Sequence, residues 1–132
     1  MSNSEVKSLT PKEALEYCNN GATIVDIRED YLTAYKYFDV KSIVNIPFED
    51  LDKEIDELKE LKTLIIADSA GIISKKASAE LKSKGFTEIY NLSGGLIEWE
   101  RDGLPITEDI NERLTGACAC QLKPRDARNF KD

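Results

Sequence analysis

The 132-residue sequence contains no histidine, and this absence narrows the chemistry that it can support. Without an imidazole there can be no Ser-His-Asp or Cys-His catalytic site and no histidine ligand for a metal ion. Cysteine is also scarce. The three cysteines, Cys18, Cys118 and Cys120, are an odd number and too few for a disulfide scaffold. Because Cys18 shares an apolar helical stripe with Ala14, we expect its thiol to be buried.

Long apolar segments and an excess of positive charge are missing as well. No stretch approaches the roughly 20 apolar residues that span a bilayer, and residues 1–7 lack the apolar core of a signal peptide. The formal net charge is −7, with 18 lysines and arginines against 25 aspartates and glutamates. We therefore expect a cytoplasmic protein whose partners include neither nucleic acid nor membrane.

The sequence does contain short apolar segments that alternate with amphipathic ones. Strands are predicted at residues 23–27, 42–46, 64–67 and 88–91, with a short edge strand near residues 6–9. Helices are predicted from Pro11 to Asn20, over residues 31–38, 49–61 and 74–84, and from Gly95 to Gly103. This alternation predicts an α/β fold with a parallel sheet and right-handed crossovers.

Two of these helices carry specific end signals. Thr10, Pro11 and Glu13 form a capping box with proline at the first helical position. Gly85 and Phe86 predict a Schellman stop after the helix over residues 74–84. On that helix we expect Ile73, Ala77 and Leu81 to face the core.

The central strand, residues 64–67, leads into a tight loop that we predict to be the site. Carboxyl ends of parallel strands are where ligands bind in open sheets, and unpaired N–H groups at the start of a helix favour an anion. The loop contains no cysteine, arginine or lysine. Its residues are Asp68, Ser69, Ala70, Gly71, Ile72 and Ile73, followed by Ser74, where the helix begins.

Several sequence segments together resemble the rhodanese-like domain over residues 6–106. They are IVDIRE at 24–29, NIP at 45–47, GF at 85–86, IYNLSGG at 89–95, and Trp99 followed by DGLP at 102–105. The resemblance implies a five-stranded parallel sheet with helices on both faces. It also implies an active cysteine after the central strand, in a loop patterned C-x-x-G-x-R-S, that carries a persulfide. Matching Gly71 and Ser74 to this pattern places the cysteine position at Asp68 and the arginine position at Ile73.

The aspartate at this position changes what the loop can do. A carboxylate cannot accept a sulfane sulfur as a thiolate does, so we expect no conventional thiosulfate sulfur transfer at Asp68. Instead, the carboxylate can occupy the N–H groups of the loop as a helix cap, which stabilises the fold by about 0.5–2 kcal/mol. The alternative, Asp68 as a nucleophile that forms an acyl phosphate, needs additional acids for Mg²⁺ and a nearby lysine. Asp26 is one such acid at a strand end.

A C-terminal extension, residues 107–132, follows the predicted domain of residues 1–106. Ile106, Ile110 and Leu114 recur at helical spacing, so we expect a short helix before the Cys118-Ala119-Cys120 segment. The two thiols have three interpretations that stay open. They form a sulfur or redox site, they bind a soft metal, with four thiolates in a homodimer, or they pack as small apolar residues.

Together these observations favour a binding or regulatory module that has lost the catalytic loop cysteine. Its partner would be another protein or a sulfur carrier, and we expect no cofactor. One alternative is an active sulfurtransferase in which Cys118 or Cys120 carries the persulfide. The other alternative is soft-metal binding through the same two cysteines.

Overall fold

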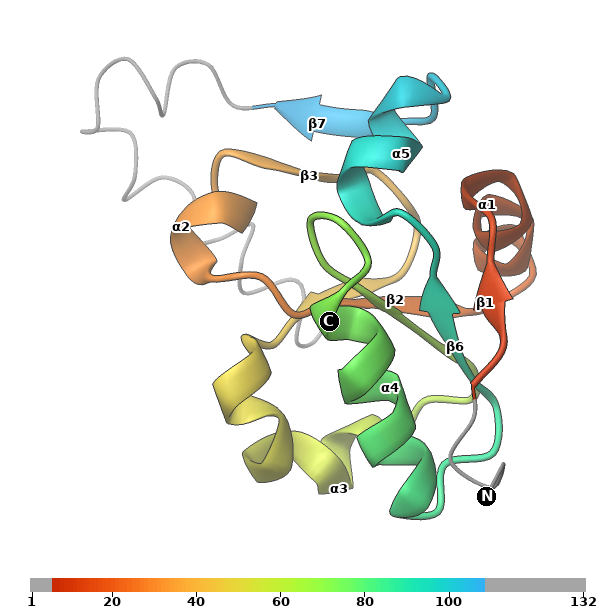
Figure 1. Cartoon of the computed structure of the whole chain (residues 1–132), viewed down its shortest axis with the longest axis vertical. Coiled ribbons are helices and arrows are strands. Elements are labelled where there is room, and N and C mark those ends of the chain that lie inside the picture. Colours follow the sequence, from red (N-terminus) through yellow and green to blue (C-terminus); the bar gives the residue numbers. More distant parts are fainter. Residues whose placement is uncertain (1–5, 109–132) are drawn as a thin grey trace.

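A five-stranded parallel sheet forms the centre of the computed structural model, which describes residues 6–108 (Figure 1). The strand order is β1-β6-β5-β2-β4, and every neighbouring pair is parallel. The strands are β1 (Ser8–Leu9), β2 (Thr23–Asp26), β4 (Ile43–Asn45), β5 (Leu64–Ala67) and β6 (Ile89–Leu92). The predicted parallel α/β sheet is confirmed, with β5 in its middle.

Helices cover both faces of this sheet, as Figure 1 shows. One face carries α1 (Pro11–Asn19) and α5 (Gly95–Arg101), and the other carries η2 (Phe48–Glu54), α3 (Ile55–Leu58) and α4 (Ile73–Ser83). A hydrophobic core lies on each face of the sheet, and successive strand residues point alternately into the two cores. Ile24 and Ile65 lie in one core, and Val25 and Ile66 lie in the other. None of the helices between residues 6 and 108 has the length and apolarity needed to cross a membrane.

The predicted helix ends are confirmed. The backbone N–H of Glu13 donates to the Thr10 hydroxyl, and the Thr10 N–H donates to the Glu13 carboxylate, which completes the capping box. At the end of α4 the Phe86 N–H donates to the Leu81 carbonyl (3.4 Å) and the Gly85 N–H to the Lys82 carbonyl (3.0 Å). These two bonds define the Schellman motif.

The predicted helix over residues 31–38 is wrong in its second half. Helix α2 covers only Asp30–Thr33, and β3 (Lys36–Phe38) pairs antiparallel with β7 (Ile106–Glu108). Phe38 is buried edge-on against Trp99, with ring centroids 5.1 Å apart, and the Trp99 indole N–H donates to the Pro105 carbonyl (2.7 Å). The helix expected from Ile106 is therefore a strand as far as Glu108, and its remainder lies outside the described residues.

Two smaller expectations about the helices on the second face also need correction. The segment predicted as one helix over residues 49–61 begins with the 3-10 helix η2, because the chain turns tightly after Pro47 and the Asp50 N–H donates to the Pro47 carbonyl (2.8 Å). On α4, Ala77 and Leu81 are buried as expected, but Ile73 is exposed. Ser74 takes the buried position, because its hydroxyl has a partner inside the fold.

Candidate functional site

The loop between β5 and α4 lies at the carboxyl edge of the central strand (Figure 1). Strand β5 ends at Ala67, and α4 begins at Ile73. Strands β2 and β6 flank β5, so their carboxyl ends lie on either side of the loop. The loop that the sequence predicts to be the site therefore lies at the edge of the sheet where ligands bind in open parallel sheets.

The Asp68 carboxylate is turned into the loop and fills it. One oxygen accepts the Gly71 N–H, and the other accepts the N–H groups of Ile73 (2.8 Å) and Ser74 (3.2 Å). The side chain is buried although its neighbours Ser69 and Ala70 are exposed. The predicted capping role is thus seen directly: a covalently attached carboxylate takes the N–H groups that would otherwise be available to an external anion.

The Gly94-Gly95 turn at the start of α5 fixes the backbone of the loop. The Leu96 N–H donates to the Asp68 carbonyl (2.9 Å), and the Ile97 N–H donates to the Ser69 carbonyl (3.0 Å). Gly95 has a φ of +63°, and a Cβ at this position would lie 2.5 Å from the Asp68 carbonyl oxygen. This close approach explains physically why glycine is needed here.

A hydrogen-bond chain runs from the start of α4 through β6 to the edge strand β1. The Ser74 hydroxyl donates to the Asn91 Oδ1 atom (2.5 Å), and the Asn91 side-chain amide donates to the Ser8 hydroxyl (3.1 Å). Ser74 and Asn91 are both buried. Sequence reasoning missed this chain, because its members are brought together only by the parallel pairing of β1 with β6 and by the packing of α4 on β6.

Asp26 and Arg28 form a buried ion pair beside the loop. The guanidinium contacts both oxygens of the Asp26 carboxylate, with the shortest contact at 2.8 Å, and also donates to the Lys36 carbonyl (2.7 Å). Burial raises the pKa of the Asp26 carboxyl, Arg28 opposes this rise, and the charge of Asp68 adds to it. Asp26 is therefore engaged with Arg28, which does not support its use as a Mg²⁺ ligand in the acyl-phosphate alternative.

Comparisons with known proteins identify the family. A model of the rhodanese-like domain matches residues 10–102. Thiosulfate sulfurtransferase GlpE of Actinobacillus pleuropneumoniae serotype 7 (strain AP76) is 31% identical over 99 residues, which cover 74% of this chain and 90% of that protein. This chain belongs to the rhodanese-like domain family. GlpE of Ectopseudomonas mendocina is 33% identical over 103 residues, covering 73% of the chain and 86% of the relative.

Solved structures confirm the rhodanese-like fold. The rhodanese-related protein from Thermoplasma volcanium superposes with a TM-score of 0.68 at 22% identity, covering 78% of this chain and 99% of that one. A rhodanese-like domain protein from Staphylococcus aureus gives a TM-score of 0.65 at 26% identity, covering 78% and 100%. The five-stranded sheet inferred from the sequence is the fold that these structures share.

Among residues 6–108 of this rhodanese-like domain the one cysteine is Cys18, which lies on α1 and not in the loop. Cys18 is buried on α1, and this burial raises the pKa of its thiol to about 12. A thiol so rarely ionised is a poor nucleophile, as expected for a packing residue. Cys118 and Cys120, with the rest of the predicted extension beyond Glu108, lie outside the described residues, so their roles stay predictions.

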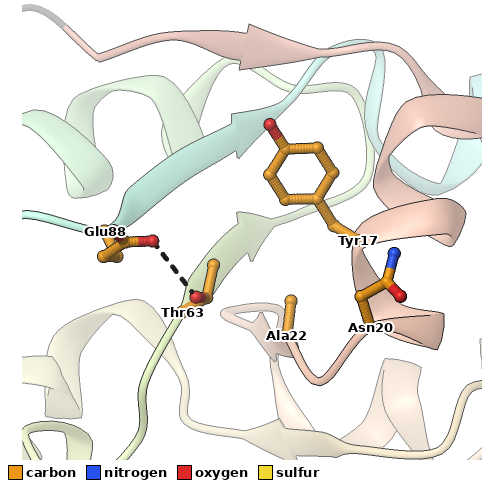
Figure 2. Close-up of a pocket in the computed structure, with 5 residues that line it drawn as sticks. All are labelled: Tyr17, Asn20, Ala22, Thr63 and Glu88. Carbon is orange, nitrogen blue, oxygen red and sulfur yellow. Dashed lines mark hydrogen bonds between the residues drawn. The ribbon is translucent and has the colours of Figure 1, made fainter.

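A shallow hollow of about 230 Å³ lies at the opposite edge of the rhodanese-like sheet (Figure 2). Its lining comes from α1 and from the residues just before β2, β5 and β6: Tyr17, Asn20, Ala22, Thr63 and Glu88. The Thr63 hydroxyl donates to the Glu88 carboxylate (3.4 Å), as the dashed line in Figure 2 shows. The hollow is separated from Asp68 by the length of the strands and adds no group to the loop.

Proposed function

We propose that this rhodanese-like domain does not transfer sulfur from thiosulfate at its Asp68 loop and acts instead as a binding or regulatory module. The observation that carries the proposal is the Asp68 carboxylate, which already accepts the N–H groups of Gly71, Ile73 and Ser74. In the proposed state the loop is permanently occupied by its own anion.

The chemistry of sulfur transfer explains why this occupation matters. In the reaction named in the GlpE relatives, we expect a thiolate to attack the outer sulfur of thiosulfate, so that sulfite leaves and a persulfide remains. The family pattern assigns that thiolate to position 68. A carboxylate there forms no persulfide, and its negative charge repels thiosulfate from the N–H groups that it occupies. The partner that we propose is therefore another protein or a sulfur carrier, recognised without covalent chemistry at position 68.

A second function has one observation in its favour. The last residue of β7, Glu108, pairs with Lys36, which follows α2, so the described chain ends near the carboxyl edge of the sheet (Figure 1). Cys118 and Cys120 follow at short sequence distance, with Lys123 and Arg125 to favour their thiolates. In this second proposal one of these thiolates attacks thiosulfate, sulfite leaves, and the persulfide passes its sulfur to an acceptor.

Thiosulfate:cyanide assays on the full chain separate the two proposals. We expect the intact protein and its Cys118→Ser/Cys120→Ser variant to produce thiocyanate at the uncatalysed rate. Turnover that is lost in the double variant would support the sulfurtransferase and contradict the binding module. Turnover that persists in the double variant would contradict both, because it would place a sulfur carrier within the domain itself.

A further inference from the structure

Three large apolar side chains are exposed around the loop between β5 and α4. They are Ile72 (75% exposed) and Ile73 (47%), which follow Asp68, and Ile97 (52%) on α5. The Ile97 N–H donates to the Ser69 carbonyl (3.0 Å), so the start of α5 lies beside the loop (Figure 1). We call Ile72, Ile73 and Ile97 the loop face.

The loop face differs from the rest of the described domain in its exposed apolar side chains. Nearly all other large aliphatic side chains of residues 6–108 lie in the two cores or pack against them. In the same range Tyr31, on α2, is the one other exposed large hydrophobic residue. Single exposed apolar residues are normal on a surface, whereas a group at one site marks a contact surface. The loop face therefore has the character of a surface that another molecule covers.

Two exposed lysines lie next to these isoleucines. Ile72 has helical backbone angles (φ −88°, ψ −52°) and α4 begins at Ile73, so residues three and four positions after Ile72 lie on the same side of the helix. Lys75 and Lys76 occupy these two positions, and both are exposed. Neither lysine forms a salt bridge with another residue of the range 6–108. Their positive charge is therefore available to another molecule.

The fold gains little from positive charge at this position. Lys75 and Lys76 lie at the start of α4, where the helix dipole favours acids and disfavours cations. The chain as a whole has a net charge of −7, so these lysines also differ in sign from the rest of the protein. Beside Ile97, the Glu98 carboxylate is paired with Arg101 (2.8 Å). Charge that the fold does not use, next to apolar groups that it does not bury, indicates a partner with acidic and apolar side chains.

We propose that the loop face binds an acidic, apolar segment of a partner protein. The apolar side chains of this segment cover the three isoleucines, and its carboxylates pair with Lys75 and Lys76. The proposal rests on the proposed function, in which the domain binds a protein without covalent chemistry at position 68, and it names the face and the chemistry of the partner. Because the Asp68 carboxylate already accepts the N–H groups of the loop, the acids of the partner bind outside the loop, at the lysines.

Other occupants of the loop face are less favoured by charge. Two copies of a chain with a net charge of −7 repel each other, and an anionic membrane that attracts two lysines repels the chain as a whole. A short segment of a partner protein meets the lysines locally, at distances where salt screens the rest of the chain.

A displayed library of random peptides, selected on the full chain, tests the proposal without knowledge of the partner. We expect the enriched peptides to combine aspartate or glutamate with large apolar residues. Their binding should shift the amide signals of Ile73 and Ile97 far more than that of Thr63 at the opposite edge of the sheet. No enrichment, enriched peptides without acids, or shifts confined to the opposite edge would overturn the proposal.

Reversing the charge of the two lysines tests their role. Lys75→Glu/Lys76→Glu should bind the acidic peptides at least about tenfold more weakly, because two attractive contacts become repulsive. In its own selection this variant should enrich basic apolar peptides instead. Unchanged binding of the acidic peptides would contradict the pairing with Lys75 and Lys76.

Lys59→Glu/Lys62→Glu is the matched control. It makes the same charge change at two exposed lysines that precede β5, at the opposite edge of the sheet, and should bind the acidic peptides as the wild type does. Acids are favoured in the first turn of a helix, so Lys75→Glu/Lys76→Glu should unfold at no lower a temperature than the control. Equal loss of binding in the two variants would mean that net charge, and not the loop face, attracts the peptides.

Two measurements test the other occupants. Sedimentation of the full chain, and its retention by vesicles of phosphatidylcholine and phosphatidylserine, should be the same for the wild type and Lys75→Glu/Lys76→Glu. A dimer or a vesicle complex that the substitutions abolish would assign the loop face to a second copy or to a membrane, and would overturn the proposal.

The thiosulfate assay distinguishes failure of this proposal from failure of the proposed function. No turnover together with no selected peptides would remove the loop face as a binding site and leave the binding module. Turnover by a Cys118→Ser/Cys120→Ser variant that still binds the acidic peptides would remove the non-catalytic function and leave the loop face.

Discussion

Replacing Asp68 with alanine tests the physical basis of the site. The substitution removes the acceptor for the N–H groups of Gly71, Ile73 and Ser74. Loss of a helix cap costs about 0.5–2 kcal/mol, and an N–H left without a partner costs about 1–3 kcal/mol where water cannot replace the bond. Because Ser69 and Ala70 are exposed, water reaches part of the loop. We therefore expect a loss of about 2–4 kcal/mol, or about 8–16 °C in Tm at roughly 4 °C per kcal/mol.

The N–H groups that the Asp68→Ala substitution frees should then bind an oxyanion. In Asp68→Ala, sulfate is expected to occupy the freed N–H groups and to stabilise the fold by about 2.7 kcal/mol at a hundred times its Kd. Sulfate also stabilises proteins in general by exclusion from their surface, so the wild type measured at the same salt concentration is the control. Thermal unfolding across a sulfate series gives the difference, and amide shifts at Gly71 and Ile73 locate the ion.

Asp68→Asn provides a graded comparison. The amide keeps the size of the side chain and one acceptor oxygen, but its NH₂ group faces N–H donors of the loop. We expect its stability to lie between those of the wild type and Asp68→Ala, and its sulfate response likewise. If Asp68→Ala unfolds within about 0.5 kcal/mol of the wild type and sulfate stabilises both equally, the carboxylate does not hold the loop and the reasoning is refuted.

Three further predictions concern the surroundings of the loop. Gly21→Ala should cost roughly 1–2 kcal/mol of left-handed backbone strain, because no other atom lies within 4 Å of a Cβ at that position. Gly95→Ala should destabilise the fold by more, because its Cβ would also collide with the Asp68 carbonyl. Equal denaturation midpoints for the two variants would contradict this. Burial raises the pKa of the Cys18 thiol from 9.0 to about 12, so its contribution to stability is complete below pH 9. Above pH 9 the free energy of unfolding, measured relative to Cys18→Ala, should fall by about 1.4 kcal/mol per pH unit. A difference between the two proteins that does not change with pH would exclude the shift. Arg28→Met should destabilise the fold by about 3–5 kcal/mol, because it leaves the buried Asp26 carboxylate unpaired. Adding Asp26→Leu should recover most of this loss, which a double-mutant cycle in urea measures. Additive losses would mean that the pair is not coupled.

Local signals account for the parts of the fold that were predicted correctly. The capping box at Thr10 and the Schellman stop at Gly85 depend on contacts within a few residues, so the sequence contains all the information they need. The buried strand of residues 64–67 was equally clear, because a short β-branched run between polar segments suits the centre of a parallel sheet.

The incorrect predictions involve contacts between distant residues. Strands β3 and β7 are short, and each exists because it pairs with the other across most of the chain. Local helical spacing at Ile106 therefore pointed to the wrong structure. In the folded chain Phe38 packs against Trp99 and pairs with Ile106, and the Asp39 N–H donates to the Pro105 carbonyl.

At the candidate site too, contacts between nearby residues could be predicted and contacts between distant residues could not. The capping role of Asp68 was predictable, because its partners Gly71, Ile73 and Ser74 follow it closely in the chain. The Ser74–Asn91 bond was not predictable, since β6 brings Asn91 into place from a distant part of the sequence. The exposure of Ile73 was missed for a related reason: helical spacing gives a face but not the rotation of that face relative to the loop.

Mass analysis after treatment with thiosulfate tests the central claim most directly. The full chain and its Cys118→Ser/Cys120→Ser variant are incubated with thiosulfate, and any added sulfur is located by peptide mapping under non-reducing conditions. We predict that the double variant gains no sulfur and that the peptide containing Asp68 is unchanged. A sulfur adduct on the peptide that contains Asp68 would contradict the conclusion that Asp68 closes the loop to sulfur chemistry.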